Sequence, residues 1–443
     1  MSVETGPGVA ARGLLAGRDR VRTPRHPRLL RDVLAGLVIL AFAGWGVRVN
    51  LLEGFIYEWP RHFRGDFYNA MFVSWDGTGI YYGPVFVLER WLVDLAPQVF
   101  NEYFFGVLNV FLTVAAFATA ALAARLSWRL ATIAAAAWLC FHWLTYSFSV
   151  SANPEFVELL LLCLAWYLAV STRPSLGLAA TAAATLTKRI PALFAPLLLM
   201  LEWSWRSLAQ AAGITVVITA VVAIGQRMNP LDVLQATFPF QLPLKQVGAG
   251  GYQPQIHDEV TVLLAQPFPY PSQELSLSNA LARLTHRPMS DWSLPFFQGF
   301  YYVFTAGVVL VALYVAWALI RGPRRVEREL AATLCFAIFF ALLPLAAITT
   351  HPHTFLFMLP VWTALLALIA RSQGATRAYL ALVGGIGFLF AGFPAAVSPV
   401  DRLLHAHLDM SPLFQDPILI DVAVIAGLIA YATALVYRPR TIG

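Results

Sequence analysis

The sequence predicts an all-α polytopic membrane protein, built as a bundle of about 12 transmembrane helices. Of its 443 residues, 59% are hydrophobic and 12% are charged, so the chain carries more apolar surface than a soluble domain buries. The apolar residues fall into many windows of about 20 residues, the length that a helix needs to cross roughly 30 Å of hydrocarbon. This division excludes a single soluble core.

The first part of the chain is expected to stay on the cytoplasmic side until one span crosses the membrane. Residues 1–30 contain several arginines and predict a basic cytoplasmic tail. This charged region is longer than that of a signal peptide, and no small-residue cleavage site follows the apolar run Val33–Leu52. We therefore expect that run to remain as the first span. The segment Tyr82–Ala96 is too charged to span and predicts an amphipathic helix at the membrane interface.

Each further expected span is an apolar run with polar residues at its ends. The runs are Tyr103–Ala124, Leu130–Val150, Phe156–Ser171, Leu176–Thr187, Ile190–Trp203, Leu208–Gly225, Phe296–Ile320, Leu330–Ile348, Phe355–Ala370, Tyr379–Val397 and Ile418–Val436. The two short runs between 176 and 203 either cross separately or form a re-entrant pair. Both alternatives leave the sidedness of the later loops unchanged.

The basic residues give the orientation, because cytoplasmic loops retain an excess of Lys and Arg. With the N-terminus inside, most of the 30 Lys and Arg residues fall on the cytoplasmic side and most acidic residues fall outside. We therefore expect a plasma-membrane protein with both termini cytoplasmic, residues 438–443 forming the C-terminal end. The transmembrane catalytic domain is expected over 31–437. Its outer-face loops are expected at 53–101, 226–295 and 398–417.

Asp66, in the first outer loop, is the candidate catalytic residue. It lies between Arg64 and a run of aromatic residues, and nearby glycines allow a polar ligand to come close. A carboxylate at this place could remove the proton from an attacking hydroxyl group. The alternative is that Asp66 and Asp76 are ordinary turn residues, because Asp beside Gly is common in turns.

The expected outer face also carries cations that could bind a phosphate group, namely Lys188, Arg189, Arg283, His351 and His353. Preorganised positive charge stabilises a leaving phosphate better than mobile water does. Lys188 and Arg189 could instead only extend from a span end toward the surface, and Arg283 could be a solvated loop charge. The two histidines lack an evident third metal ligand, so we expect them to bind phosphate or sugar and expect no metal site.

Three more residues are candidates for substrate contact on this face. Asn153 and Glu155 flank Pro154 at the start of a span, where Asn suits a helix N-cap and Glu favours the positive end of the helix dipole. This local role competes with a role in binding. Tyr82 belongs to an aromatic-rich outer segment, which fits sugar stacking, although Tyr and Trp are common at any membrane interface.

The chain has no nucleotide-binding motif of the P-loop or dinucleotide type. Nucleotide donors are also scarce outside the cell, so an enzyme on the outer face would need an activated donor carried by lipid. The three cysteines lie in apolar windows and are expected to be small buried residues. We expect no cofactor and no nucleic-acid partner.

Several short motifs in order along the chain resemble the family 87 glycosyltransferases of the C-type membrane class. They are Gly65-Asp66-Phe67-Tyr68, Tyr81-Tyr82-Gly83-Pro84, Asn153 heading a span, Thr187-Lys188-Arg189-Ile190-Pro191, Glu274–Leu284 and Thr350–Pro360. The family more often has Gln before the residue matched by Asn153, and Asn-Gln where this chain has Glu274-Leu275.

The resemblance implies a C-type glycosyltransferase-like bundle and an inverting reaction. The donor would be a polyprenyl-phosphate sugar, commonly mannose, so the chain would be a mannosyltransferase of the cell envelope. The acceptor would be a glycolipid or an envelope glycan, reached on the outer face of the lipid bilayer. Asp66 matches the family's catalytic base.

Two other functions remain open from the sequence. A transporter or flippase of a lipid-linked sugar would show ionisable residues deep within spans, or broken helices paired between two halves. In this chain the charges collect near the outer span ends, and no internal repeat is visible. A structural membrane subunit is the third alternative.

Overall fold

We describe a computed structural model of the chain. It describes residues 83–93, 95, 101–141, 155–171, 173–237, 277, 294–322, 326–346, 352–388 and 417–437, together with 36, 37, 40, 41, 44 and 48. The regular secondary structure of these residues is helical, and no β-strand occurs among them. The all-α prediction is therefore confirmed for this part of the chain.

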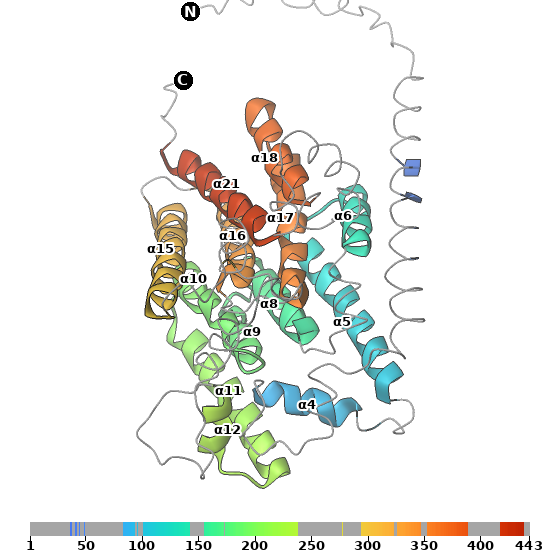
Figure 1. Cartoon of the computed structure of the whole chain (residues 1–443), viewed down its shortest axis with the longest axis vertical. Helices are drawn as coiled ribbons and strands as arrows, with labels where there is room; N and C mark the ends of the chain where they lie inside the picture. Colours follow the sequence, from blue (N-terminus) through green and yellow to red (C-terminus); the bar gives the residue numbers. More distant parts are fainter. Residues whose placement is uncertain are drawn as a thin grey trace, which may run out of the picture.

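The helices form one bundle, with α4 lying across its lower end in Figure 1. In chain order the elements are α4 (Pro84–Val93), α5 (Asn101–Ala123), α6 (Trp128–Cys140), α8 (Glu155–Val170), α9 (Ser175–Thr185), η3 (Ile190–Leu193), α10 (Phe194–Leu201), α11 (Trp205–Gln226), α12 (Pro230–Thr237), α15 (Leu294–Arg321), α16 (Arg328–Ala346), η5 (Pro352–Phe357), α17 (Met358–Arg371), α18 (Gly374–Gly387) and α21 (Pro417–Tyr437).

Six helical segments of the described chain are long and apolar enough to cross a membrane. They are Gly106–Ala123, Trp205–Gln226, Val303–Arg321, Arg328–Ala346, Thr354–Arg371 and Pro417–Tyr437. Each coincides with an expected span, so the prediction of a multi-pass membrane protein is confirmed at this level. The full count of about 12 is not confirmed, because among the described residues several expected spans are shorter helices.

The shorter helices include both parts of the segment that was expected to cross twice or re-enter. α9 has 11 residues and is thus only about 16 Å long, well below the membrane thickness. η3 and α10 continue one another over Ile190–Leu201 and are also short. α8 has 16 residues and α18 has 14. Most of the first expected span, Val33–Leu52, lies outside the described residues.

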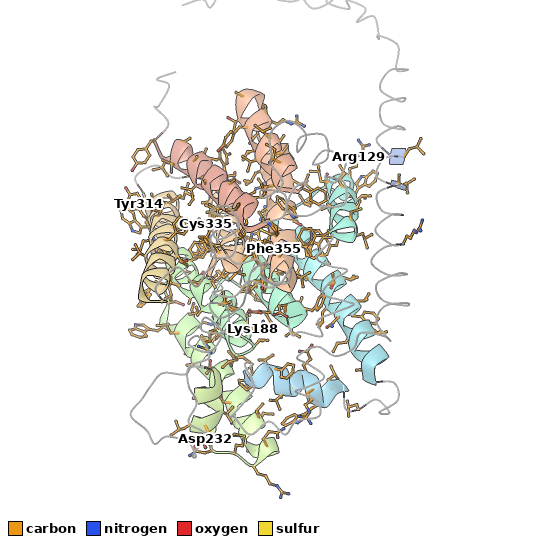
Figure 2. The ribbon with its side chains drawn as sticks, viewed as in Figure 1. Arg129, Lys188, Asp232, Tyr314, Cys335 and Phe355 are labelled. Atoms are coloured by element: carbon orange, nitrogen blue, oxygen red, sulfur yellow. The ribbon has the colours of Figure 1, made fainter. Side chains whose placement is uncertain are left out.

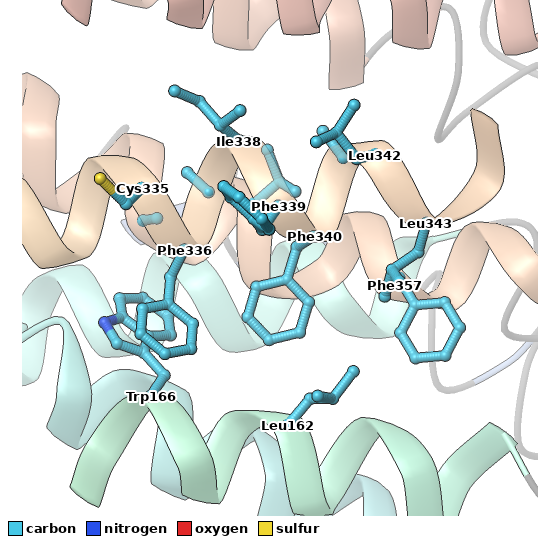
Figure 3. Packing of buried hydrophobic residues seen from close by; sticks show 14 of the residues in the cluster. Leu162, Trp166, Cys335, Phe336, Ile338, Phe339, Phe340, Leu342, Leu343 and Phe357 are labelled. Atoms are coloured by element: carbon cyan, nitrogen blue, oxygen red, sulfur yellow. The ribbon is translucent and has the colours of Figure 1, made fainter. Parts of the chain in front are cut away.

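The centre of the bundle is α16, whose side chains are buried on all faces from Ala331 to Leu345. Phe336 stacks on Trp166 of α8 with 5.9 Å between ring centroids, and Phe340 meets Phe194 of α10 edge-on at 5.1 Å. Figure 3 shows Trp166 lying against Phe336. Aromatic pairs of this kind contribute about 0.5–1.5 kcal/mol beyond their buried area. The aromatic residues therefore fix how α8 and α10 pack on the central helix.

The outer helices expose apolar side chains, in contrast to α16. Ile224 of α11 is 79% exposed, and Val303 and Leu310 of α15 are 74% and 65% exposed. A helix that is apolar on its exposed face and long enough to span suits contact with lipid tails. The exposed faces of α11 and α15 thus support a membrane location.

Arginine side chains tie together several helix ends at one end of the bundle, which we call the arginine end. Arg125, just after α5, pairs with Glu329 of α16 at 2.5 Å. Arg371, at the end of α17, donates a hydrogen bond of 3.2 Å to the carbonyl oxygen of Ala124. The α5–α6, α15–α16 and α17–α18 connections therefore lie together.

Two more contacts add the α10–α11 connection to the arginine end. Arg321 of α15 donates to the carbonyl oxygen of Met200 at 3.0 Å, and Arg328 lies 3.6 Å from Glu202. All these connections were expected on the same, cytoplasmic side. Their meeting at one end agrees with the expected alternation of the helices, while the side of the membrane stays a prediction.

α4 lies where an interfacial helix was expected, but it is more buried than that prediction implied. Phe86 and Val87 are each 1% exposed. The backbone N–H groups of Gly83 and Val85 donate to the carbonyl oxygens of Thr187 and Leu186, at 2.8 and 3.2 Å. The start of α4 is therefore hydrogen-bonded to the turn after α9, and the helix packs against the bundle.

The contact between α4 and α11 leads to a first prediction. A Cβ atom on Gly225 would lie 2.2 Å from the ring of Trp91, so Gly225→Ala forces the Trp91 side chain or α4 itself to move away from α11. We expect a loss of roughly 1–3 kcal/mol in the free energy of unfolding, measured by denaturant titration in mixed micelles. Gly213→Ala is the matched control in the same helix, because nothing lies within 4 Å of its added Cβ. Equal stability of the two variants would contradict this packing.

The sidedness of the two ends gives a second prediction, tested by cysteines at the exposed residues Asp232 and Glu327. The natural cysteines Cys140, Cys163 and Cys335 are buried and leave a low background. In intact cells, a membrane-impermeant maleimide should label Asp232→Cys directly and Glu327→Cys only after permeabilisation. The reverse pattern would invert the expected orientation.

Candidate functional site

Three of the motif-bearing segments come together at the α4 end of the bundle. The ammonium group of Lys188 forms an ion pair with Oε1 of Glu155, the first residue of α8. The side chain of Glu155 is 1% exposed and that of Lys188 is 22% exposed. Gly83, at the start of α4, is bonded to Thr187, the neighbour of Lys188. In Figure 2, Lys188 lies between the central bundle and α4.

The local sequence explains why Lys188 is held at this point. α9 ends at Thr185, and the N–H groups of Thr187 and Lys188 both donate to the carbonyl oxygen of Ala184, at 2.9 and 3.3 Å. Pro191 then lies in the first turn of η3 and starts a new direction of the chain. Lys188 thus follows a helix C-terminus, where a cation is stabilised, and Glu155 opens a helix N-terminus, where an anion is stabilised.

Glu158 adds a second carboxyl group from the same face of α8. It is three residues from Glu155, a spacing that places side chains next to each other on a helix. It is 1% exposed, and its Oε2 has no hydrogen-bond partner among the described residues. Lys188 and Glu155 are near enough for their charges to act on it.

Glu89 of α4 adds a third carboxyl group, which the sequence analysis missed. Its side chain is 5% exposed, and within the described part of the chain neither carboxyl oxygen has a hydrogen-bond partner. Burial, and to a smaller extent the negative charge of Glu155, raises the pKa of Glu89 from 4.5 to about 8. At neutral pH this carboxyl group is therefore mostly protonated.

Together Glu89, Glu155, Glu158 and Lys188 form what we call the acid–lysine cluster. Lys188 pairs with Glu155, and Glu89 and Glu158 are two further buried carboxyl groups, so full ionisation of all three would leave more negative than positive charge. A low-dielectric site disfavours such charge and favours bound protons instead. The cluster can accept hydrogen bonds from hydroxyl groups, present one cation to an anionic group, and hold a proton. No group of three metal-ligating side chains occurs in the described ranges.

Two of the remaining predicted site residues lie in the described part of the chain, and five lie outside it. Arg189 is partly buried beside Lys188, directly before η3. His353 belongs to η5, which packs against α8, α16 and α17, so the backbone of this motif lies next to the helix that carries Glu155. Five predicted residues lie outside the described residues: Asp66, Tyr82, Asn153, Arg283 and His351.

The structure also bears on two alternatives that the sequence left open. Lys188 does not extend freely to the surface, because its ammonium group is bound to a buried carboxylate. Glu155 does begin α8, as the helix-start explanation required, but it also makes the long-range pair with Lys188. Neither residue is therefore explained by its local helix end alone.

No family model matches the chain, and no curated protein or solved structure matches it. The resemblance to family 87 glycosyltransferases therefore rests on the short motifs, three of which meet at the acid–lysine cluster.

The buried ion pair gives a third prediction, measured by a double-mutant cycle on the free energy of unfolding. Lys188→Ala should cost about 3–5 kcal/mol, because it removes the cation that is paired with the buried carboxylate of Glu155. The double variant Lys188→Ala/Glu155→Gln should be more stable than Lys188→Ala alone, giving a coupling energy of at least about 1 kcal/mol.

Arg125 and Glu329 provide the matched control pair for this cycle. Their side chains are 57% and 26% exposed, so the corresponding cycle should give less than about 1 kcal/mol. Coupling energies of similar size for the two pairs would contradict the burial of the Lys188–Glu155 contact.

Proposed function

We propose that the chain is an inverting membrane glycosyltransferase. It moves a sugar, with mannose as the favoured candidate, from a polyprenyl-phosphate donor to a glycolipid or envelope glycan on the outer face of the plasma membrane. The observation that carries the proposal is the acid–lysine cluster. It lies at the end of the bundle opposite the arginine end, and it is built from segments that resemble the family 87 motifs.

The reaction needs a base and a group that stabilises the leaving phosphate. In the proposal, the acceptor hydroxyl attacks the anomeric carbon from the side opposite the phosphate. The new carbon–oxygen bond forms as the bond to phosphate breaks, so the configuration inverts. Asp66 takes the hydroxyl proton, and the bonding electrons leave with the phosphate oxygen. Lys188 then lies near the negative charge that develops on the phosphate.

The carboxyl groups around Lys188 have a supporting role in this scheme. Glu155 holds the ammonium group in one place, so that little reorganisation is needed when the phosphate becomes charged. Glu158 has an oxygen without a hydrogen-bond partner among the described residues, which suits it to accept a hydrogen bond from a sugar hydroxyl. A cluster of this composition fits a ligand that is both anionic and rich in hydroxyl groups.

A transporter of a lipid-linked sugar is the second candidate, because buried ionisable residues are also typical of transport pathways. Transporter sites often lie between broken helices, and Lys188 does lie at the break between α9 and η3, so the position of the cluster fits both functions. The enzyme is favoured by the ordered motifs that resemble the family 87 glycosyltransferases.

One experiment separates these functions. Purified protein in lipid vesicles is given radiolabelled polyprenyl-phosphate mannose and a lipid extract of a bacterial envelope. Label in a new glycolipid supports the transferase. Movement of the donor between leaflets without a new product supports the transporter. If neither a new glycolipid nor movement of the donor is observed, the chain would be a structural subunit, and this outcome would contradict the proposal.

The catalytic base gives a fourth prediction. Asp66→Asn keeps the size of the side chain but removes the base, so transfer should fall by about 10² to 10⁴-fold. Asp76→Asn, in the same loop, should retain transfer. If Asp66→Asn stays active and Asp76→Asn does not, the base has been assigned to the wrong residue.

The cation gives a fifth prediction. Loss of a charge-assisted hydrogen bond to phosphate costs about 1.5–3 kcal/mol, so Lys188→Ala/Glu155→Gln should raise the KM for the donor about tenfold or more. The KM for the acceptor should hardly change. The single variant Glu155→Gln keeps the Lys188 cation, so it separates the effect of losing the Glu155 carboxylate from the effect of losing the cation. Equal effects on both substrates would remove Lys188 from the donor site.

A further inference from the structure

Glu89 is the group at the α4 end that the proposed mechanism does not use. It comes from α4, whereas the other members of the acid–lysine cluster come from α8 and the turn after α9. α4 packs on α11 and α12, and Gly83 and Val85 fasten its start to Thr187 and Leu186. Leu88 of α4 and Val157 of α8, the chain neighbours of Glu89 and Glu158, pack against the same small buried core, so α4 brings Glu89 to the start of α8.

The burial of Glu89 has no explanation in the packing of α4 alone. Its neighbours Phe86 and Val87 are buried apolar side chains, so Glu89 is a carboxyl group in an apolar part of the helix. A buried carboxyl group without hydrogen bonds costs free energy. With both oxygens lacking a partner among the described residues, Glu89 suits a ligand or a role in the charge balance of the site.

The charges around α4 show which group interacts with Glu89. The charged residues on α4 itself and on the described elements that pack near it are Arg90, Glu102, Glu155, Glu158, Lys188, Arg189, Arg206, Arg227 and Asp232. Arg206 is exposed and lies at the far end of α11. Arg227 and Asp232 are exposed, where solvent and salt screen their charges. The charge that acts on Glu89 is that of Glu155, the ion-pair partner of Lys188.

We propose that Glu89 is a positioning residue that keeps a proton beside Glu155, limits the negative charge around Lys188, and so lets an anionic substrate group approach. The inference rests on the proposed function for the identity of that group, a polyprenyl-linked phosphate. Ionised Glu89 would add a second negative charge beside the Glu155–Lys188 pair. An arriving phosphate would then meet repulsion in a site where solvent screens little.

The protonation of Glu89 gives a dependence on pH with a definite sign. Because its pKa is raised to about 8, the proton stays bound at neutral pH and is lost above that value. Affinity for a phosphate should therefore be high at about pH 7 and lower at about pH 9. Gln is a neutral isostere of the protonated acid, so Glu89→Gln should keep the high affinity at both pH values.

The test begins with infrared spectroscopy of the full-length protein in lipid nanodiscs, which needs no ligand. Wild-type protein should show a protonated carboxyl band that disappears as the pH rises through about 8. Glu89→Gln should lack that component. Glu327→Gln, at an exposed glutamate of the arginine end, should retain it. Absence of the band in wild type, or its persistence in Glu89→Gln, would overturn the proposal.

Calorimetry with a short-chain polyprenyl phosphate then tests whether the protonation of Glu89 changes the affinity for the phosphate. Between about pH 7 and pH 9 the wild-type Kd should rise about tenfold more than the Kd of Glu89→Gln does. The variant is the control for the titration of the phosphate itself, because that titration affects both proteins equally. A parallel change in both proteins, or no binding by either, would overturn the role of Glu89 in anion approach.

The two readouts also separate this inference from the proposed function. A positive result in both, with no sugar transfer by the wild type, would leave Glu89 as a positioning residue in a phosphate site and reject the transferase. Sugar transfer with the same pH dependence in wild type and Glu89→Gln would keep the transferase and reject the role of Glu89. A merely structural role would lower stability in Glu89→Gln without changing the pH profile.

Discussion

The ion pair between Lys188 and Glu155 is the contact on which the arrangement of the α4 end depends. It joins the turn after α9 to the start of α8, and the same turn binds α4 through the backbone of Gly83 and Val85. Removing two charges from water costs several kcal/mol per ion, and a well-packed apolar pair would often be equally stable. A buried pair with two more carboxyl groups beside it therefore contributes little to stability. It is better suited to a site that binds a charged ligand.

The two ends of the bundle use charge in different ways. At the arginine end, the pair of Arg125 with Glu329 is partly exposed, so solvent and salt weaken it. At the α4 end, the carboxyl groups of Glu89, Glu155 and Glu158 are buried, so solvent screens their charges less. Many basic residues near connections at one end also fit the rule for cytoplasmic loops. The two ends therefore differ in how strongly solvent and salt screen their charged groups.

The sequence predicted the helical architecture well because long apolar runs have few alternatives in a membrane. It predicted the short helices poorly, since the apolar residues of α9 and α10 are buried by protein and do not need span length. Lys188 and Glu155 could be chosen from motifs at span ends, but their pairing joins positions 33 residues apart and depends on tertiary packing. Glu89 gave only a weak signal, one acid in an otherwise mostly apolar helix. Its importance arises from burial beside Glu155, which no local pattern shows.

The acid–lysine cluster is proposed to receive the phosphate of a lipid-linked sugar. The most direct measurement is an electron cryomicroscopy structure of the full chain in a lipid nanodisc with polyprenyl-phosphate mannose bound. We expect the phosphate within hydrogen-bonding distance of the Lys188 ammonium group, about 2.7–3.2 Å, with the Asp66 carboxylate on the opposite side of the anomeric carbon. A phosphate bound at the arginine end, or at the α4 end without contact to Lys188, would contradict it.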